Sequence, residues 1–304
     1  MLMNQAELRT ARDWVTAGEE AFAAADLYYG HGADNPLDDA LALVRFAAGI
    51  HWQAEEESYD QSLTQAVCAQ ISDLFERRIK ERLPVPYLTG EAWFAGLPFK
   101  VTPDVLIPRS PFAELILEGF QPWLADTDPK RILDLCTGSG CIAIACAYAF
   151  PQARVTGTDL SSAALAVAEE NRVAHELEER LNLIEADVFA GLPPERYELI
   201  VSNPPYVPDT EMATLPDEYR HEPALALRAD DDGLAIVERI LLGAPDYLSV
   251  RGWLAVEVGN SQDAVERRWP DLPLTWLEFE RGGDGVFIIS AQELSAWAAA
   301  QDSA

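Results

Sequence analysis

The stretch Arg131-Ile132-Leu133-Asp134-Leu135-Cys136-Thr137-Gly138-Ser139-Gly140-Cys141 decides the fold of this 304-residue chain. Residues 131–135 are a short apolar run that predicts a buried β-strand, and an apolar helical run begins after Gly140. Glycines between a strand and a helix let the backbone approach a ligand closely at the carboxyl edge of a parallel sheet. The stretch therefore predicts an α/β domain with a ligand site at that edge.

The pattern around this stretch extends the prediction to a whole sheet. From Lys130 onward, short apolar runs alternate with helical stretches, which is typical of a parallel sheet wrapped by helices. Only Glu280-Arg281-Gly282-Gly283-Asp284 joins the last two runs, which is too short for a crossover helix, so we expect an antiparallel hairpin at the sheet edge. The seven predicted strands are residues 131–135, 154–158, 181–184, 197–201, 253–258, 274–279 and 285–290.

The first eighty or so residues predict a small helical domain. Apolar residues recur at helical spacing over residues 14–25 and 63–75. Between these two runs, Asn35 suits an N-cap and Pro36 suits the first position of another helix.

A short linker is expected after the helical domain. Pro84 and Pro86 are expected to end the third helix. Residues 87–107 then predict a hairpin-like connection, with turns at Gly90 and at residues 96–98.

The charge of the chain limits its partners. The net charge is −29 with a pI near 4.3, and only three lysines stand against nineteen arginines. Such a protein repels phosphate, so we expect no direct binding to nucleic acid, whereas a basic protein partner would be attracted. A solvated acidic surface adapted to high salt is the alternative origin of this charge.

The sequence predicts no membrane or metal site. The longest apolar run, residues 141–150, is too short to span a bilayer, and no basic-then-apolar signal is visible, so we expect a soluble, cytoplasmic protein. Cys136, Cys141 and Cys146 recur at intervals of five, which is not the spacing of zinc ligands, and are interpreted as reduced thiols.

Two nucleoside cofactors compete for the glycine-rich loop. Gly138, Gly140 and Ala143 match the G-x-G-x-x-A pattern of dinucleotide sites, and Asp159 ends the second predicted strand, where a carboxylate can accept both ribose hydroxyls. A nicotinamide dinucleotide and S-adenosylmethionine both fit that pattern. Asp134 favours the second, because a carboxylate there can meet an ammonium group but would crowd a pyrophosphate.

A second loop, Asn203-Pro204-Pro205-Tyr206, follows the fourth predicted strand. Its prolines have no N–H donor, so the loop offers carbonyl oxygens beside an aromatic ring, which suits a planar NH2 group. Such a sequence is also ordinary turn punctuation after a strand. Its interpretation therefore depends on the cofactor loop upstream.

Residues 131–290 resemble the seven-strand S-adenosylmethionine-dependent methyltransferases. The resemblance implies that residues 136–140 surround the methionine part of the cofactor, that Asp159 binds the ribose and that Asp187 lies near the adenine. Methyltransferases with an Asn-Pro-Pro-Tyr loop act on planar amino groups, either adenine or cytosine amines or the glutamine amide. The predicted cofactor-binding residues are Asp134, Cys136, Thr137, Gly138, Ser139, Gly140, Asp159, Asp187 and Asn203, and the predicted catalytic residues are Asn203, Pro204, Pro205 and Tyr206.

Further motifs extend the resemblance over nearly the whole chain. Val105-Leu106-Ile107-Pro108-Arg109 and Glu222-Pro223-Ala224-Leu225-Ala226-Leu227 match the protein-glutamine methyltransferases that carry an N-terminal helical domain. The chain is similar to the branch that methylates large-subunit ribosomal protein three, a basic protein substrate, in residues 28–36, 87–89, 92–94, 107–111, 136–141, 218–223 and 282–287. One departure is local: release-factor methyltransferases usually read proline directly after the arginine, whereas here Ser110 stands there.

The resemblance implies an α/β fold: a seven-stranded, Rossmann-like methyltransferase domain at residues 109–304, a hairpin linker at 86–108 and a helical substrate-recognition domain at 1–85. Glutamine methylation of peptide release factors, a DNA adenine amino-methyltransferase and a non-catalytic ribosome assembly factor stay as alternatives.

Overall fold

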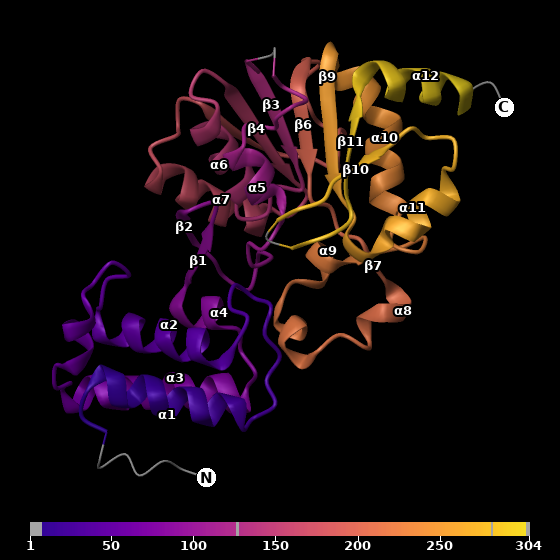
Figure 1. Ribbon diagram of the computed structural model, residues 1–304. Coiled ribbons are helices and arrows are strands. Elements are labelled where there is room, and N and C mark those ends of the chain that lie inside the picture. Colours follow the sequence, from indigo (N-terminus) through magenta and orange to yellow (C-terminus); the bar gives the residue numbers. More distant parts are fainter. Residues whose placement is uncertain (1–7, 126–127, 281, 302–304) are drawn as a thin grey trace. The chain divides into compact units, whose positions relative to one another are not determined.

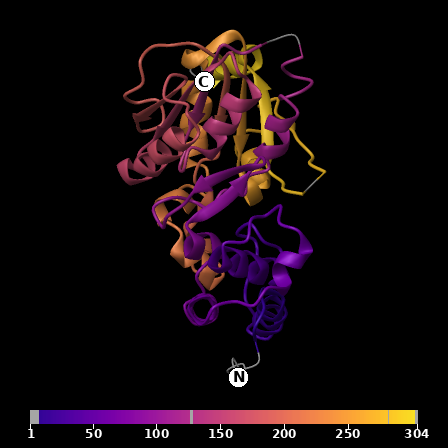
Figure 2. The ribbon, with the colours of Figure 1, turned by 90° about the vertical axis from the view of Figure 1, so that its left-hand side faces the viewer.

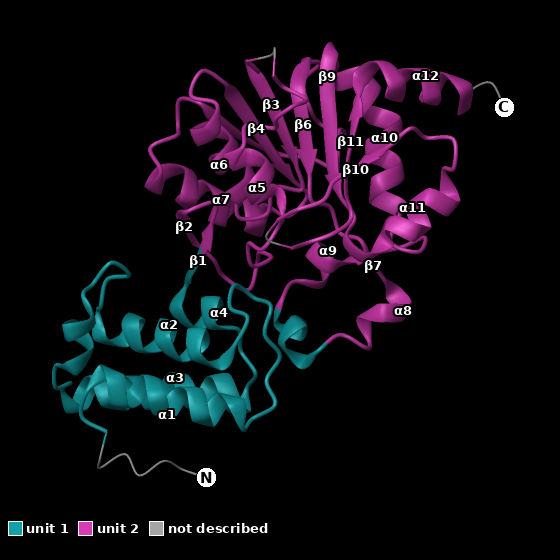
Figure 3. Ribbon diagram, viewed as in Figure 1, with its two compact units in different colours: residues 1–92, 216–221 teal, residues 93–215, 222–304 magenta. Residues whose placement is uncertain are grey.

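The computed structural model describes residues 8–125, 128–280 and 282–301 (Figure 1). The chain divides into two compact units (Figure 3). Unit 1 contains Met1–Ala92 together with Pro216–His221, and unit 2 contains Trp93–Leu215 together with Glu222–Ala304. The chain therefore enters unit 1 twice. Among the described residues, no helix combines the length and the apolar character that crossing a membrane requires.

Unit 1 is helical, as predicted. Its helices are α1 (Ala11–Ala23), α2 (Pro36–Ala48), α3 (Gln65–Lys80) and α4 (Val85–Thr89), with 3-10 turns η1 (Glu56–Asp60) and η2 (Asp217–His221). The Asn35 side chain caps α2 by accepting from the Asp38 N–H, and Pro36 is the first helical residue, which confirms both predictions. The rings of Trp14 and Phe22 pack edge-on against Phe75 in the core between α1 and α3.

The predicted hairpin in the linker is confirmed, but the position of its turn and the assignment of residues 87–89 differ from the prediction. Strands β1 (Glu91–Phe94) and β2 (Leu97–Lys100) form a two-stranded sheet. Their turn is Ala95-Gly96 rather than residues 96–98, because two residues with positive φ (49° and 78°) close a two-residue hairpin whose twist matches its strands. Residues 87–89 belong to α4, and Pro84 is the N-cap of that helix, four residues beyond the end of α3.

Unit 2 is built on a seven-stranded sheet, which confirms the predicted fold class. The strands lie in the order β10-β11-β9-β6-β3-β4-β5, and only β11 runs against its neighbours. Helices cover both faces of the sheet (Figures 1 and 2). The strands are β3 (Arg131–Leu135), β4 (Arg154–Asp159), β5 (Leu181–Glu185), β6 (Tyr197–Ser202), β9 (Leu248–Glu257), β10 (Thr275–Trp276) and β11 (Val286–Ser290).

Successive side chains of a strand point to opposite faces of the sheet, so the core is divided between these two faces. Ile132 of β3 packs into the cluster beneath α5 (Phe112–Leu117) and α6 (Cys141–Ala149). Its neighbours Leu133 and Leu135 pack into the opposite cluster with α10 (Ala235–Tyr247), α11 (Gln262–Arg268) and α12 (Ala291–Gln301). Both faces of β3 are thus apolar, as expected of a central parallel strand.

Two strand boundaries differ from the prediction by more than one residue. Strand β9 begins at Leu248 rather than at residue 253, because Leu248 pairs with Tyr197; the register then shifts, and regular pairing resumes at Trp253 opposite Leu199. Strand β10 ends at Trp276 rather than at residue 279, and one further backbone bond follows it, from the Leu277 N–H to the Val286 carbonyl at 2.9 Å. The antiparallel pairing of β10 with β11 at the sheet edge is confirmed, although Arg281 of their connection lies outside the described residues.

One buried amide joins the hairpin to the loop after β3. Asn171, on α7 (Ser162–Ala174), is 1% exposed. Its amide nitrogen donates to the carbonyls of Lys100 (3.0 Å) and Ser139 (2.8 Å), and its oxygen accepts from the Lys100 N–H (2.7 Å). All three bonds satisfy backbone groups, so Asn171 fixes the Ser139 loop from below.

Asn171→Ala should lower the free energy of unfolding by about 3 kcal/mol, because it leaves buried backbone groups without partners. Urea unfolding of unit 2, followed by tryptophan fluorescence, measures this change. Asn182→Ala, which removes an exposed asparagine on β5, is the matched control and should stay within about 0.5 kcal/mol of the parent. Equal stability of the two variants would contradict the bracing role.

Candidate active site

Three parallel strands end together and bring the predicted site residues to one edge of unit 2. In the sheet register, Leu135 of β3 lies beside Thr158 of β4 and Ser202 of β6. The Ser202 hydroxyl also donates to the Leu135 carbonyl at 2.9 Å. Cys136 and Asn203, the next residues after β3 and β6, therefore follow at the same carboxyl edge, where open α/β sheets bind ligands.

A solvent-open pocket lies at this edge. Its walls include the segment 104–110, which the sequence did not single out as pocket-forming, and Leu225, Ala226 and Ile236. Four of the predicted site residues, Asp134, Gly140, Pro204 and Tyr206, lie outside the lining. The predicted residues that line the pocket are Cys136, Thr137, Gly138, Ser139, Asp159, Asp187, Asn203 and Pro205.

Asp134 lies buried beneath the glycine-rich loop. Its Oδ2 accepts from the Thr137 hydroxyl (2.5 Å) and from the Ala143 N–H (3.1 Å). Among the described residues, its Oδ1 has no hydrogen-bond partner. Burial raises the pKa of Asp134 from 3.8 to about 7, against the lowering effect of these two donors. The carboxylate therefore braces the loop, and one of its oxygens remains without a bond.

Asp159 and Asp187 reach the pocket from the next two strands. The Asp159 carboxylate accepts from the N–H groups of Gly138 and Ser161, both at 2.9 Å, and burial raises its pKa. Asp159 therefore connects the loop after β3 to the start of α7. Asp187 is about half exposed, at 48%, and pairs with Arg239 at 2.8 Å, which lowers the pKa of Asp187.

The Asn203 loop divides its residues between the pocket and the core. Asn203 and Pro205 line the pocket, and the Asn203 carboxamide makes no hydrogen bond to a described residue. Pro204 is buried. The loop thus presents a free amide to the pocket, whereas its aromatic residue is held from behind.

Two neighbours hold Tyr206. Its hydroxyl donates to Glu257 Oε1 at 3.2 Å, and its carbonyl accepts from the Ser261 hydroxyl at 3.1 Å. Gly259 lies so close that a Cβ atom there would stand 2.6 Å from the Tyr206 ring, and its φ of +46° is one that side chains rarely adopt. The ring position therefore depends on the glycine.

Glu257 is a residue that the sequence reasoning missed. It ends β9, is 5% exposed, and accepts from the hydroxyls of Ser110 and Tyr206. Burial raises the pKa of Glu257, and the two hydroxyl donors oppose that shift. Ser110 was the one signal available, because it departs from the usual proline and supplies this hydrogen bond.

Two of the matched motifs meet in an ion pair. Arg109 binds Glu222 through both guanidinium branches, at 2.5 and 2.7 Å, and Glu222 Oε1 also accepts from the Ile107 N–H at 3.0 Å. Bidentate geometry fixes both orientation and distance. Arg109 therefore joins the segment 105–110 to the segment that returns after the Asn203 loop.

Comparison with known proteins shows the family of the chain. Residues 113–217 match the family described as "Methyltransferase small domain". The chain is 49% identical to the ribosomal protein uL3 glutamine methyltransferase of Xylella fastidiosa (strain Temecula1), over 95% of this chain and 93% of the relative. It is 44% identical to the protein of the same name from Francisella tularensis (strain SCHU S4), over 94% and 92%. The chain belongs to the uL3 glutamine methyltransferase family.

A solved structure shows the same fold at lower identity. The hMettl16 catalytic domain, crystallised with an RNA hairpin of the MAT2A 3'UTR, superposes with a TM-score of 0.53 at 16% identity. The match covers 81% of this chain and 89% of that one. The methyltransferase fold is thus shared well beyond the uL3 glutamine methyltransferase family.

Gly259→Ala should displace the Tyr206 ring and lower methyltransferase turnover about tenfold or more, because its methyl group would overlap the ring. Gly119→Ala is the matched control, since Gly119 also has a positive φ (+63°) but open space around its Cβ position. Steady-state rates and melting temperatures of both variants separate ring displacement from backbone strain. Equal rates in the two variants would show that the Tyr206 position is unimportant.

The raised pKa of Asp134 predicts a pH-dependent stability. Because the folded-state pKa of about 7 lies above the unfolded value of 3.8, folding favours the protonated acid, and this contribution is lost as pH rises through 7. Between pH 5 and 8 the loss is roughly 3 kcal/mol. Asp134→Asn should remove that part of the slope, measured by urea unfolding without added ligand. Parallel pH profiles of parent and variant would refute the assignment.

Proposed function

We propose that this protein transfers a methyl group from S-adenosylmethionine to the side-chain amide nitrogen of a glutamine in ribosomal protein uL3. One observation carries the proposal: the Asn203 carboxamide lines the pocket with no hydrogen bond to a described residue, at the edge where the glycine-rich loop also ends. The relatives named for this activity match almost the whole chain, which supports the same reaction here.

The residues at the glycine-rich loop suit this cofactor. The Asp134 Oδ1 and the Ser139 hydroxyl are buried and have no hydrogen-bond partner among the described residues, so each can accept from a polar ligand group. Asp159 lines the same pocket with a carboxylate that retains unused lone pairs. In our proposal residues 136–140 and Asp134 hold the methionine part, Asp159 holds the ribose and Asp187 lies near the adenine. When bound, the cofactor supplies a methyl group activated by its sulfonium.

The Asn203 loop supplies the acceptor side of the reaction. A glutamine amide nitrogen is a weak nucleophile because its lone pair is delocalised into the carbonyl. The Asn203 side-chain oxygen and the Pro204 carbonyl would accept its two hydrogens, which aligns the nitrogen and concentrates electron density on it. Pro205 shapes the wall, and Tyr206, held by Glu257, would pack on the amide plane. Methyl transfer to the nitrogen first gives an N-protonated amide cation, which is strongly acidic and loses one proton to solvent without a dedicated base, leaving the neutral N-methyl amide.

The charge of the chain favours a basic protein as the substrate. At a net charge of −29, association with a basic ribosomal protein is accelerated, whereas nucleic acid is repelled. We assign substrate recognition to the helical part of the chain, and we place the reaction in the cytoplasm, where ribosomal proteins are made.

Asn203→Ala should reduce methylation of uL3 by about 10²- to 10³-fold, because it removes a hydrogen-bond acceptor that acts on the reacting nitrogen. Affinity for the cofactor should change less than threefold, since the residue contacts the acceptor more than the donor. Incorporation of tritium from labelled S-adenosylmethionine into purified uL3 measures the rate, and calorimetry measures the affinity. Asn182→Ala again serves as the exposed control and should keep parental activity.

The same assay decides the substrate. Purified uL3, peptide release factors and plasmid DNA are offered separately to the parent protein. Labelling of uL3 supports the proposal if mass spectrometry locates on a glutamine a mass gain of about 14 Da, which is one methyl group in place of one hydrogen. Labelling of release factor alone would transfer the activity to that substrate, and labelling of DNA would overturn the protein-substrate reading.

A further inference from the structure

Residues 207–221 form one long excursion of the chain, between the Asn203 loop and the pocket-wall residue Pro223. After Tyr206 it passes through β7 (Val207–Pro208) and α8 (Asp209–Met212), both in unit 2. Residues Pro216–His221 then belong to unit 1, and the chain returns to unit 2 at Glu222 (Figure 3). The excursion therefore has its base in one unit and its tip in the other.

The base is closed within unit 2. Strand β7 pairs in parallel with β8 (Arg228–Ala229), and Arg228 donates to the Asp209 carboxylate at 2.7 Å. This short ladder closes the loop that carries the tip.

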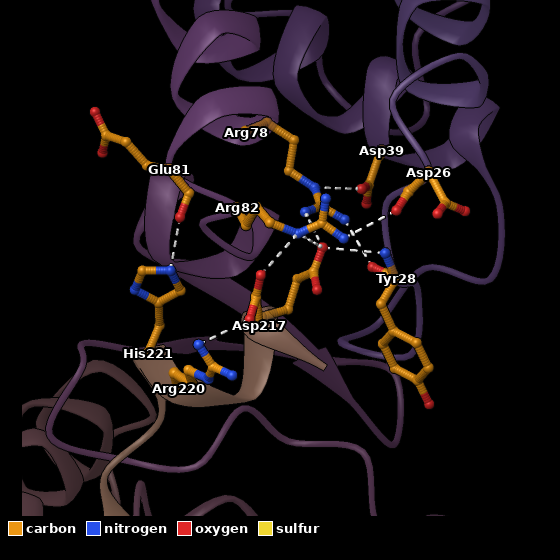
Figure 4. A network of polar contacts seen from close by, with 10 residues as sticks. Asp26, Tyr28, Asp39, Arg78, Glu81, Arg82, Asp217, Arg220 and His221 are labelled. Atoms are coloured by element: carbon orange, nitrogen blue, oxygen red, sulfur yellow. Dashed lines mark hydrogen bonds and ion pairs between the residues drawn. The ribbon is translucent and has the colours of Figure 1, made fainter. Parts of the chain in front are cut away.

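The tip is held within unit 1 by one buried carboxylate. Glu218 is fully buried, at 0% exposure. Its Oε1 accepts from the Tyr28 N–H (3.0 Å) and from Arg78 Nη1 (3.3 Å), and it lies 3.2 Å from Arg82 Nε (Figure 4). Taking a carboxylate this far from water is costly unless its partners are held in place.

Arg78 is itself held on three sides. Its side chain is 3% exposed, and it donates to Asp39 Oδ2 and to the Tyr28 carbonyl, both at 2.8 Å, in addition to Glu218 (Figure 4). Burial raises the pKa of Asp39, and the neighbouring Arg78 opposes that shift. The guanidinium fork thus connects α2 and α3 to Glu218, which stands 140 positions later in the chain.

Aromatic packing and a second polar contact reinforce the same junction. The Tyr219 ring packs on His31 (4.6 Å between centroids) and on Tyr28 (5.5 Å). The His221 ring contacts the Glu81 carbonyl at 2.8 Å. Residues 28–36 and 218–223 both carry the resemblance, although residues 28–36 and 218–221 do not line the pocket. The two motifs therefore meet at this junction.

The chain segments before and after residues 216–221, the tip, connect it directly to the acceptor side of the pocket. Glu222, the residue that binds Arg109, stands four positions after Glu218, and Pro223 lines the pocket. Tyr206 precedes Pro216 by ten positions. A displacement of the tip must be absorbed by one of these two short connections.

We propose that residues 216–221 are a latch, and that Glu218, Arg78 and Arg82 are positioning residues for methyl transfer. Through the latch, the helical unit fixes the chain that carries the Asn203 loop and Glu222, so that acceptor binding and acceptor alignment depend on the same buried ion pairs. The proposal rests on the proposed function. A purely structural role would stabilise unit 1 and leave the kinetics of the folded enzyme unchanged.

The first test lengthens the connection between the Asn203 loop and residues 216–221 without changing the ion pairs of Glu218. A Gly-Ser-Gly-Gly insertion directly after the exposed Thr214 leaves Glu218 and its partners intact. The latch predicts a loss of about 10²-fold in kcat/KM for uL3, because small misplacements of acceptor groups have effects of that size. The melting temperature and the affinity for S-adenosylmethionine should stay at parental values. The same insertion after the exposed Gln152 is the control and should keep parental kinetics.

The second test removes the charge of the latch. Glu218→Gln keeps the shape of the side chain and should lower kcat/KM for uL3 about as much as the insertion does, at temperatures where the variant is fully folded. Arg77→Gln, which affects a partly exposed pair on α3, is the control. Increased protease cleavage between residues 207 and 222 in the Glu218 variant alone would support release of the tip.

The outcomes separate the two proposals. Parental kinetics in both latch variants, with uL3 labelled by the wild type, would overturn the latch and leave the proposed function standing. A wild type that labels no polypeptide would contradict the proposed function, and with it the latch. If the wild type labels only release factor, the kinetics are measured on that protein, and a loss in both variants still supports the latch.

Discussion

The parallel register of β4, β3 and β6 is the constraint on which the site depends. Leu135 pairs with Thr158 on one side and with Ser202 on the other, so the three strands end at one level. A slip of one residue would turn the Leu133 and Leu135 side chains from one core cluster to the other. The same packing that stabilises the sheet therefore also brings the glycine-rich loop, Asp159 and the Asn203 loop to one edge.

Buried carboxylates do most of the positioning around this edge, in a chain that already carries a large negative charge. Asp134 braces the glycine-rich loop, Glu257 holds Tyr206, and Glu222 holds Arg109. Burial works against the ionised form in Asp134 and Glu257, whose pKa values are raised. Glu222 and Glu218 are paired with arginine instead, whose planar fork can satisfy several acceptors at once.

Most of the sheet could be predicted from the sequence, because short apolar runs and short connections are local signals. The bounds of β3 were predicted to the residue, and the edge hairpin followed from the shortness of its connection. The register shift between Leu248 and Trp253 could not be predicted, since residues 249–252 contain no apolar run and their place in a strand depends on the partner strand β6. Glu257 was missed for a related reason: an acid at a strand end has no meaning until the hydroxyls around it are placed.

The assignment of residues 216–221 to unit 1 shows where sequence reasoning ends most clearly. Residues 28–36 and 218–223 are both informative as motifs, yet the first alone is explained as a loop that caps the next helix. Their contact spans 190 positions, between Tyr28 and Glu218, and no periodicity or composition signal reaches that far. A buried charge of this kind is retained at a cost in stability, which is reasonable where it specifies a single arrangement. In this chain the arrangement so specified is that of the segment leading from the Asn203 loop to Glu222, whereas the helices have an apolar core of their own around Trp14 and Phe75.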